Sequence, residues 1–123
     1  MSERLVDPHT LRFSQRTAGG NGRAAILRES MGALGWNGPP VDVVEIAAGL
    51  VTIDNMRVAV ARELGLREIP IRVHAPDESL TESLQQRFPG SETWGDALAY
   101  RTGRQIPPLP IDGTPDRPRM PGT

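Results

Sequence analysis

Apolar positions recur every three or four residues in two stretches of the chain, and this period predicts amphipathic helices. The first stretch spans residues 23–34, where one apolar face would be formed by Ile26, Leu27, Met31 and Leu34. Asn21 stands just before this stretch and is a residue type that caps helices. The second stretch ends near Leu64, and either Asp54 or Asn55 can cap its beginning.

Runs of apolar and β-branched residues predict short strands around these helices. Four such runs are present, at residues 11–13, 41–46, 50–53 and 69–73. The tight turn at 47–49 joins two of them, which predicts a hairpin. Residues 1–10 have no comparable pattern, so we expect an irregular lead-in there.

The C-terminal part of the chain is more polar and predicts short helices followed by irregular structure. Ser79 and Glu82 have the spacing of a capping box, which predicts a helix to about Phe88. A second helix is predicted from Ser91 to Tyr100. After it come six prolines: Pro107, Pro108, Pro110, Pro115, Pro118 and Pro121. Proline excludes regular helix and central strand, so this tail is either draped over the domain or disordered.

These elements predict one compact α/β domain with a small mixed sheet. We expect the domain to span residues 1–105, with a core at 11–73 and a helical extension at 79–103. The proline-rich tail would then occupy residues 106–123. A chain of 123 residues with 37% hydrophobic content has room for one small core.

Charge and composition exclude several classes of function for this chain. The net charge of −1 argues against a broad electrostatic nucleic-acid binder, although it allows a local phosphate site. Every basic side chain is arginine, so each cationic contact is planar and can be bidentate. The chain has no cysteine, which excludes disulfides, thiolate catalysis and cysteine zinc sites. It also lacks a long apolar run and an apolar leader, so we expect a soluble protein with no membrane partner.

The best candidate for chemistry lies where the strand predicted at 50–53 meets the next helix. Asp54 and Asn55 precede Arg57, which would stand in the first helical turn. Free backbone N–H groups, a polar cap and a guanidinium at one point suit phosphate binding. The alternative is structural: Asp54 or Asn55 is a simple N-cap, and Arg57 forms an i, i+3 ion pair with Asp54.

Two other segments carry candidate polar groups. Ser14, Gln15 and Arg16 precede a glycine-rich loop and can bind phosphate or a base edge, or can serve as turn residues. Arg101 and Gln105 have i, i+4 spacing and would lie together near the end of the last helix. His74 at a strand end is a weaker acid–base candidate, because no partner for it can be identified.

The motifs together resemble the N-terminal domain of the ParB family, which has the ParB/sulfiredoxin fold. The matching segments lie within residues 11–73 and are Phe13–Arg16, Leu27–Ser30, Gly35–Val41, Asp54–Arg57 and Gly65–Ile71. The resemblance implies this fold, with added C-terminal helices, and implies that the segment Asp54–Arg57 contacts nucleotide phosphates. Asp54 and Asn55 stand where the family has glycine and glutamate, and an aspartate there favours a divalent cation such as Mg²⁺ between protein and phosphate. Sulfiredoxin chemistry needs a cysteine in this segment and is excluded.

The chain also resembles a divergent ParB-like branch, which is found as C-terminal toxin domains of bacterial polymorphic toxins. It rests on Phe13–Gln15, Thr52–Arg57 and Trp94–Arg101. It implies a toxin effector domain that acts on nucleic acid in the bacterial cytoplasm, with delivery inside a larger secreted protein. A cognate acidic immunity protein would then be a partner.

Our leading hypothesis is therefore a metal-assisted nuclease. Its catalytic residues would be Asp54, Asn55, Arg57 and Gln15, and Asp54 would hold the metal ion or activate water. Its phosphate-binding residues would be Ser14, Arg16, Arg57, Arg101 and Gln105. One alternative is a nucleotide-dependent hydrolase or transferase that uses the same pocket. Another is a non-catalytic module that binds a nucleotide or a protein partner.

Overall fold

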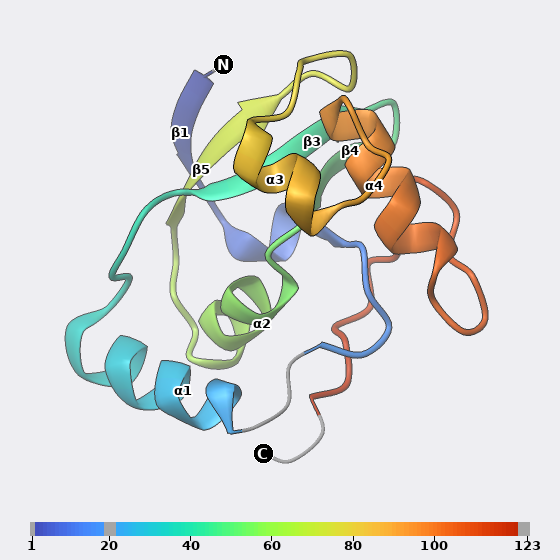
Figure 1. Cartoon of the computed structure of the whole chain (residues 1–123). Helices are drawn as coiled ribbons and strands as arrows, with labels where there is room; N and C mark the ends of the chain where they lie inside the picture. The colour runs from blue at the N-terminus through green and yellow to red at the C-terminus, as the bar shows by residue number, and fades with distance from the viewer. Residues whose placement is uncertain (1, 19–21, 121–123) are drawn as a thin grey trace.

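The computed structural model describes residues 2–18 and 22–120 (Figure 1). Five strands form one mixed sheet: β1 (Ser2–Val6), β2 (Arg12–Phe13), β3 (Val41–Ile46), β4 (Gly49–Thr52) and β5 (Ile69–His74). Their order across the sheet is β1-β5-β3-β4-β2. The pairs β1/β5 and β3/β4 are antiparallel, whereas β3/β5 and β2/β4 are parallel. The predicted hairpin, the predicted strands and the small mixed sheet are therefore confirmed.

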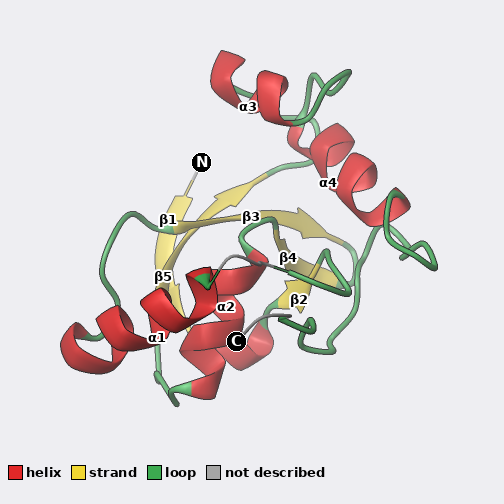
Figure 2. Cartoon of the chain, turned by 60° about the horizontal axis from the view of Figure 1, so that its bottom comes forward, coloured by secondary structure: helices red, strands yellow, loops and turns green. Residues whose placement is uncertain are grey.

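Helices cover both faces of this sheet (Figure 2). They are α1 (Arg23–Leu34), α2 (Asn55–Glu63), α3 (Glu82–Arg87) and α4 (Trp94–Gly103), and a 3-10 turn spans Pro8–Thr10. Successive strand residues point to opposite faces, so Val43 packs with α1 and α2 while Val44 packs with α3 and α4. Two apolar clusters result, one on each face of the sheet.

The N-terminal strand corrects the sequence prediction, because residues 1–10 were expected to be an irregular lead-in. Residues 2–6 pair with β5 at the edge of the sheet, and Leu5 is 62% exposed. An edge strand contacts one neighbour only and commonly carries charged residues, so its sequence lacks the alternation of a half-buried strand. Glu3 and Arg4 are examples of such residues here.

Helix α1 has the predicted bounds, but its predicted apolar face is wrong in two positions. Met31 is buried and Leu27 packs partly against the core, whereas Ile26 and Leu34 are 67% and 70% exposed. The reason is that α1 packs mainly on the narrow helix α2 rather than on the sheet, so only one stripe of α1 is covered. Its N-cap is Gly22, and the predicted cap Asn21 lies outside the described residues.

The two C-terminal helices are confirmed, but the cap of the first differs from the one expected. Thr81 is the N-cap of α3, so the predicted capping box at Ser79 and Glu82 does not form. Ser79 instead pairs with Thr93 in an isolated β-bridge. A capping box does begin α4. The Thr93 side chain accepts a hydrogen bond from the Asp96 backbone N–H, and the Asp96 side chain accepts one from the Thr93 backbone N–H.

The proline-rich tail is draped over the domain as far as residue 120, and it lies beside the segment that follows β2. Phe13 and Thr114 exchange two backbone hydrogen bonds of 2.8 and 2.9 Å. Gly113 has φ +66°, and a Cβ there would lie 2.1 Å from the Phe13 carbonyl oxygen, so no larger residue fits this contact. The boundary at residue 105 stays a prediction, because the tail and the domain share these contacts.

None of the helices within residues 2–18 and 22–120 has the length and apolar content that crossing a bilayer requires.

Candidate functional site

A polar cavity of about 200 Å³ opens at the N-terminus of α2. We call it the arginine cavity. Segments from five parts of the chain line it: Gln15, Ala18, Arg23, Ile53, Asp54, Asn55, Met56, Arg87 and Arg101. The sequence separation of these segments shows that the fold, and not one local motif, creates the cavity.

The helix end in this cavity arises where β4 ends. The Thr52 hydroxyl accepts a hydrogen bond of 2.9 Å from the Asp54 backbone N–H, which turns the chain out of the strand. Asp54 is then the N-cap of α2, as the sequence predicted. The first backbone N–H groups of a helix have no partner within the helix, and they carry the positive end of the helix dipole. Asn55 and Met56 therefore present anion-binding groups to the cavity.

Arg101 is the central cation of the cavity. Its Nη1 donates a hydrogen bond of 2.6 Å to the Ile53 carbonyl oxygen, and its guanidinium lies 4.9 Å from the centre of the Phe88 ring. Burial lowers the pKa of Arg101 to about 10; the nearby positive charge of Arg87 acts in the same direction, and Asp54 opposes it. An anion bound in the cavity would relieve this unfavourable concentration of positive charge.

Two further arginines line the cavity, and the sequence analysis had missed both. Arg23 is the first residue of α1, and Arg87 is the last residue of α3. Within the described residues, neither they nor Arg101 have a carboxylate within 4.0 Å. Arg23 stands in the first turn of its helix, as Arg57 does, so a guanidinium beside free backbone N–H groups was a signal that could have found it. Arg87 stands in a last turn, which is a favourable position and gives no signal.

Arg57 does not line the arginine cavity. Its Nε donates to Asp54 Oδ2 over 2.5 Å, and its Nη1 donates to the Pro39 carbonyl oxygen over 2.9 Å. The guanidinium also lies 4.9 Å from the centre of the Trp36 ring. Asp54 and Arg57 thus form the i, i+3 ion pair that was the structural alternative. Their predicted catalytic and phosphate-binding roles stay predictions.

Asn55 and Ser14 are buried and hold each other. The Ser14 backbone N–H donates to Asn55 Oδ1 over 2.8 Å, and Asn55 Nδ2 donates to Ser14 Oγ over 2.9 Å. Ser14 Oγ donates in turn to the Thr52 carbonyl oxygen over 2.7 Å. These bonds tie the end of β2 to the start of α2. Because these bonds engage the amide side chain of Asn55, its backbone N–H is the group that remains to bind a ligand in the cavity.

Gln15 and Arg16 are neighbours in the chain, but they line different cavities. Gln15 lines the arginine cavity, whereas Arg16 lines a second cavity of about 300 Å³. We call this second one the tail cavity; its lining residues are Arg16, Ile106, Pro107, Thr114, Asp116, Arg117 and Arg119. Gln105 lines neither: its side chain accepts from the Arg16 backbone N–H over 2.8 Å and donates to the Arg101 carbonyl oxygen over 3.0 Å.

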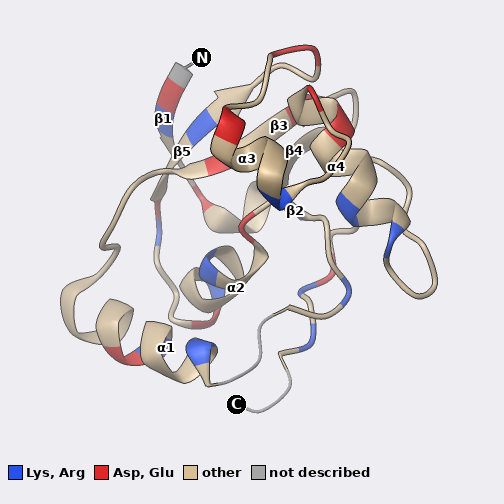
Figure 3. Ribbon diagram, viewed as in Figure 1, with Lys and Arg blue, Asp and Glu red and all other residues tan. Residues whose placement is uncertain are grey.

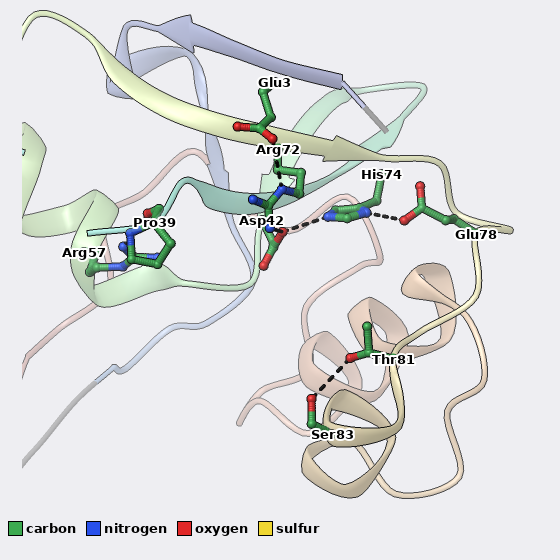
Figure 4. A network of polar contacts seen from close by, with 9 residues as sticks. All are labelled: Glu3, Pro39, Asp42, Arg57, Arg72, His74, Glu78, Thr81 and Ser83. Atoms are coloured by element: carbon green, nitrogen blue, oxygen red, sulfur yellow. Dashed lines mark hydrogen bonds and ion pairs between the residues drawn. The ribbon is translucent and has the colours of Figure 1, made fainter. Parts of the chain in front are cut away.

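His74 is one of the residues that line a third cavity, of about 450 Å³, which we call the His74 cavity. Figure 4 shows His74 between Asp42 and Glu78, with Arg72 beside Asp42. His74 is 3% exposed, and its ring stacks on Trp94 with the ring centres 3.6 Å apart. His74 Nε2 lies 2.8 Å from Asp42 Oδ1, and Nδ1 faces the Glu78 carboxylate. Arg72 lies beside Asp42, at 3.9 Å between Nη1 and Oδ1. His74, for which the sequence indicated no partner, therefore has two.

The arginine cavity is a poor fit to a divalent cation. Its one carboxylate is Asp54, and each oxygen of that carboxylate already accepts a hydrogen bond from Arg57. Three arginines line the same space and would repel a metal ion. Within residues 2–18 and 22–120, no three histidine, aspartate or glutamate side chains are grouped so as to hold a metal. The metal ion expected at Asp54 stays a prediction.

Comparison with family models finds no match to this sequence, and comparison with curated protein sequences finds none either. Solved structures do match. A sulfiredoxin from Arabidopsis thaliana has a TM-score of 0.51 at 16% identity over 71% of this chain and 96% of that one. The C-terminally truncated chromosome-partitioning protein ParB from Caulobacter crescentus, complexed with CTP-γ-S, has a TM-score of 0.53 at 16% identity.

That match covers 77% of this chain and 57% of the ParB chain. A Pnob8-like ParB-N domain has a TM-score of 0.51 at 18% identity, over 80% of this chain and 34% of that one. The chain thus has the ParB/sulfiredoxin fold that its motifs predicted. At these identities the likeness establishes the fold, and the toxin branch stays a prediction.

Proposed function

We propose that this chain binds a nucleotide in the arginine cavity, with a phosphate group at the N-terminus of α2. The observation that carries the proposal is that Arg23, Arg87 and Arg101 converge on a helix N-terminus and form no ion pair with any carboxylate of residues 2–18 and 22–120. Guanidinium groups bind phosphate oxygens in pairs, and a helix N-terminus adds backbone donors.

The charge balance of the cavity supports an anionic ligand. Three arginines face one aspartate, and that aspartate already pairs with Arg57. The whole chain has a net charge of −1, so this local excess of positive charge is not a property of the surface as a whole. In Figure 3 both α3 and α4 carry acidic as well as basic segments, so the positive excess belongs to the lining of the cavity and not to these helices as a whole.

The fold supports a nucleotide over other anions. The Caulobacter crescentus ParB structure that shares this fold is a complex with CTP-γ-S.

Calorimetric titration without divalent ions tests the proposal. CTP, ATP, GTP and inorganic triphosphate would be titrated into the wild type and into Arg87→Gln and Arg101→Gln. We expect each substitution to weaken binding about tenfold or more, because one charge-assisted hydrogen bond contributes roughly 1.5–3 kcal/mol. Arg104→Gln is the matched control, because Arg104 lies over the Tyr100 ring and lines neither the arginine cavity nor the tail cavity. Equal affinity in all four proteins would contradict the proposal.

Cleavage of nucleic acid by a toxin domain is the second candidate, and the observation that favours it is Asp54, a carboxylate in the same cavity as three arginines. Asp54 would have to release Arg57 before it could activate water. Induced expression in a bacterium, with DNA and RNA integrity read from the same cells, tests this candidate. We expect growth arrest and degraded nucleic acid with wild type and neither with Asp54→Asn. Incubation of the purified protein with DNA or RNA, with and without a chelator, tests the metal.

A toxin domain of this kind would also have a protein partner. An immunity protein that inhibits the toxin would be expected to cover the arginines with an acidic surface. Arrest with intact nucleic acid would instead support the hydrolase or transferase alternative, and a folded protein that causes no arrest would support the binding module.

A further inference from the structure

One segment of the chain forms part of the wall of both the arginine cavity and the tail cavity. Residues 14–18 form this wall; Gln15 and Ala18 line one side, and Arg16 lines the other. Gln15 and Arg16 are consecutive residues, so neighbouring positions of one segment serve two cavities.

The tail cavity is held in place by hydrogen bonds to this wall. The Arg119 backbone N–H donates to the Arg16 carbonyl oxygen over 2.9 Å, and the Ala18 N–H donates to the Arg119 carbonyl oxygen over 2.8 Å. Arg16 Nε donates to the Pro107 carbonyl oxygen over 2.7 Å. The tail therefore forms a fixed second side of the cavity.

The chemistry of the tail cavity resembles that of the arginine cavity. Arg16, Arg117 and Arg119 face one acidic residue, Asp116. Arg117 lies 3.4 Å from Glu63, whereas no ion pair to a described residue involves Arg16 or Arg119. Beside these cations stand the 93% exposed side chain of Ile106 and the ring of Pro107.

Cations next to an exposed apolar surface suit a phosphate joined to a sugar and a base. We propose that the tail cavity is a second nucleotide subsite, and that the ligand is a single-stranded oligonucleotide whose neighbouring phosphates lie in the two cavities. This inference rests on the proposed function of the arginine cavity. It adds a subsite built by the C-terminal tail of this chain, and it makes an oligonucleotide a better ligand than a mononucleotide.

Calorimetric titration with thymidine 5′-monophosphate and with the 5′-phosphorylated thymidine dinucleotide and tetranucleotide tests the subsite. We expect the dinucleotide to bind wild type about tenfold more tightly than the mononucleotide, because it adds charge-assisted hydrogen bonds. Arg119→Gln should abolish this gain while it leaves mononucleotide affinity unchanged. The substitution keeps the backbone bonds of residue 119, so the tail stays in place. Arg104→Gln is the control and should retain the full gain.

The possible outcomes separate the subsite from the function on which it rests. Mononucleotide binding without any gain from the dinucleotide would overturn the subsite and leave the proposed function standing. Absence of binding by these three ligands would overturn the subsite, and absence of binding by CTP, ATP and GTP as well would overturn the proposed function. A hexaglutamate peptide that binds as tightly as the tetranucleotide would also overturn the subsite, because the two cavities would then be a general polyanion surface.

Discussion

Residues of α3 and α4 line both the arginine cavity and the His74 cavity, but the two cavities differ in whether their charged groups have partners inside the protein. In the arginine cavity, three guanidinium groups converge with no carboxylate partner among the described residues. In the His74 cavity, each charged group faces a partner inside the protein: His74 lies between Asp42 and Glu78, and Arg72 lies between Asp42 and Glu3.

This difference separates a candidate binding site from a structural network. Charges that compensate one another inside the protein have little to gain from a ligand, and they hold their elements together. Charges that remain uncompensated raise the energy of the empty site and favour an external counter-charge. Volume alone would have favoured the His74 cavity as the binding site, because it is the larger of the two.

The largest expected effect comes from His74→Ala, which would break the compensated network. The change leaves Asp42 and Glu78 without their shared partner and removes the stack on Trp94. We expect a loss of about 2–3 kcal/mol in the free energy of unfolding, less than for fully buried pairs because both carboxylates are about a third exposed.

Urea denaturation at neutral pH measures this loss. His9→Ala, at an exposed histidine, is the matched control and should leave the urea midpoint almost unchanged. A His74→Ala variant as stable as wild type would remove the structural role and make the His74 cavity a candidate binding site instead.

Gly113→Ala tests the side of the molecule that carries the tail cavity. The added Cβ meets the Phe13 carbonyl oxygen at 2.1 Å, and the residue has φ +66°, so the tail must shift. We expect destabilisation of about 2 kcal/mol in urea and loss of the extra affinity for the dinucleotide. Gly103→Ala is the control, because a Cβ there meets no atom within 4 Å. Unchanged dinucleotide affinity in Gly113→Ala would show that the tail does not form the subsite.

Salt should distinguish the two kinds of charge. Raising the salt concentration from about 50 to about 200 mM should weaken nucleotide binding roughly five- to tenfold, because the arginines act on an exposed anion. The difference in unfolding free energy between wild type and His74→Ala should change less, since His74 itself is buried and lies in direct contact with both carboxylates. Calorimetry and urea denaturation at both salt concentrations measure the two responses. A salt-independent nucleotide affinity would argue against arginine-based recognition.

The smallest effect is expected at the surface pair of Glu63 and Arg28. The hydrogen bond from Arg28 is the main reason why the pKa of Glu63 lies below its ordinary value of 4.5, with partial burial opposing and Arg117 assisting. A lowered folded-state pKa gives stability that is present above pH 4.5 and is lost as the pH falls through the lowered value. Glu63→Gln should shift the urea midpoint slightly at neutral pH and not at all in stronger acid. A difference in urea midpoint between wild type and Glu63→Gln that grows in acid would contradict this prediction.

The regular elements of this protein were predictable to the extent that their signal was local. The helix that begins after Asp54 and the hairpin strands at 41–46 and 49–52 follow from short-range periods and caps. Strand β1 was missed because an edge strand with exposed, charged side chains lacks such a period. The exposed positions of Ile26 and Leu34 were missed because helical periodicity does not say which partner will cover a face.

The candidate site was predictable in part for the same reason. Asp54 as a cap and the Asp54–Arg57 pair lie within one helical turn, so spacing alone indicated them. Arg101 was singled out from its spacing to Gln105, but nothing local indicated that it would meet Arg23 and Arg87. Those arginines come from three helices that the sheet brings together.

The sequence by itself determined the α/β architecture, the capped helix start at Asp54 and a chemistry restricted to arginine cations, because these depend on periodicity, propensity and composition. Only the tertiary structure decided which charges find partners. It paired Arg57 with Asp54, placed His74 between Asp42 and Glu78, and left Arg23, Arg87 and Arg101 facing a shared cavity. Compensation between charges depends on distance in space, and residues far apart in the chain become neighbours only when the sheet and its two helical layers have assembled.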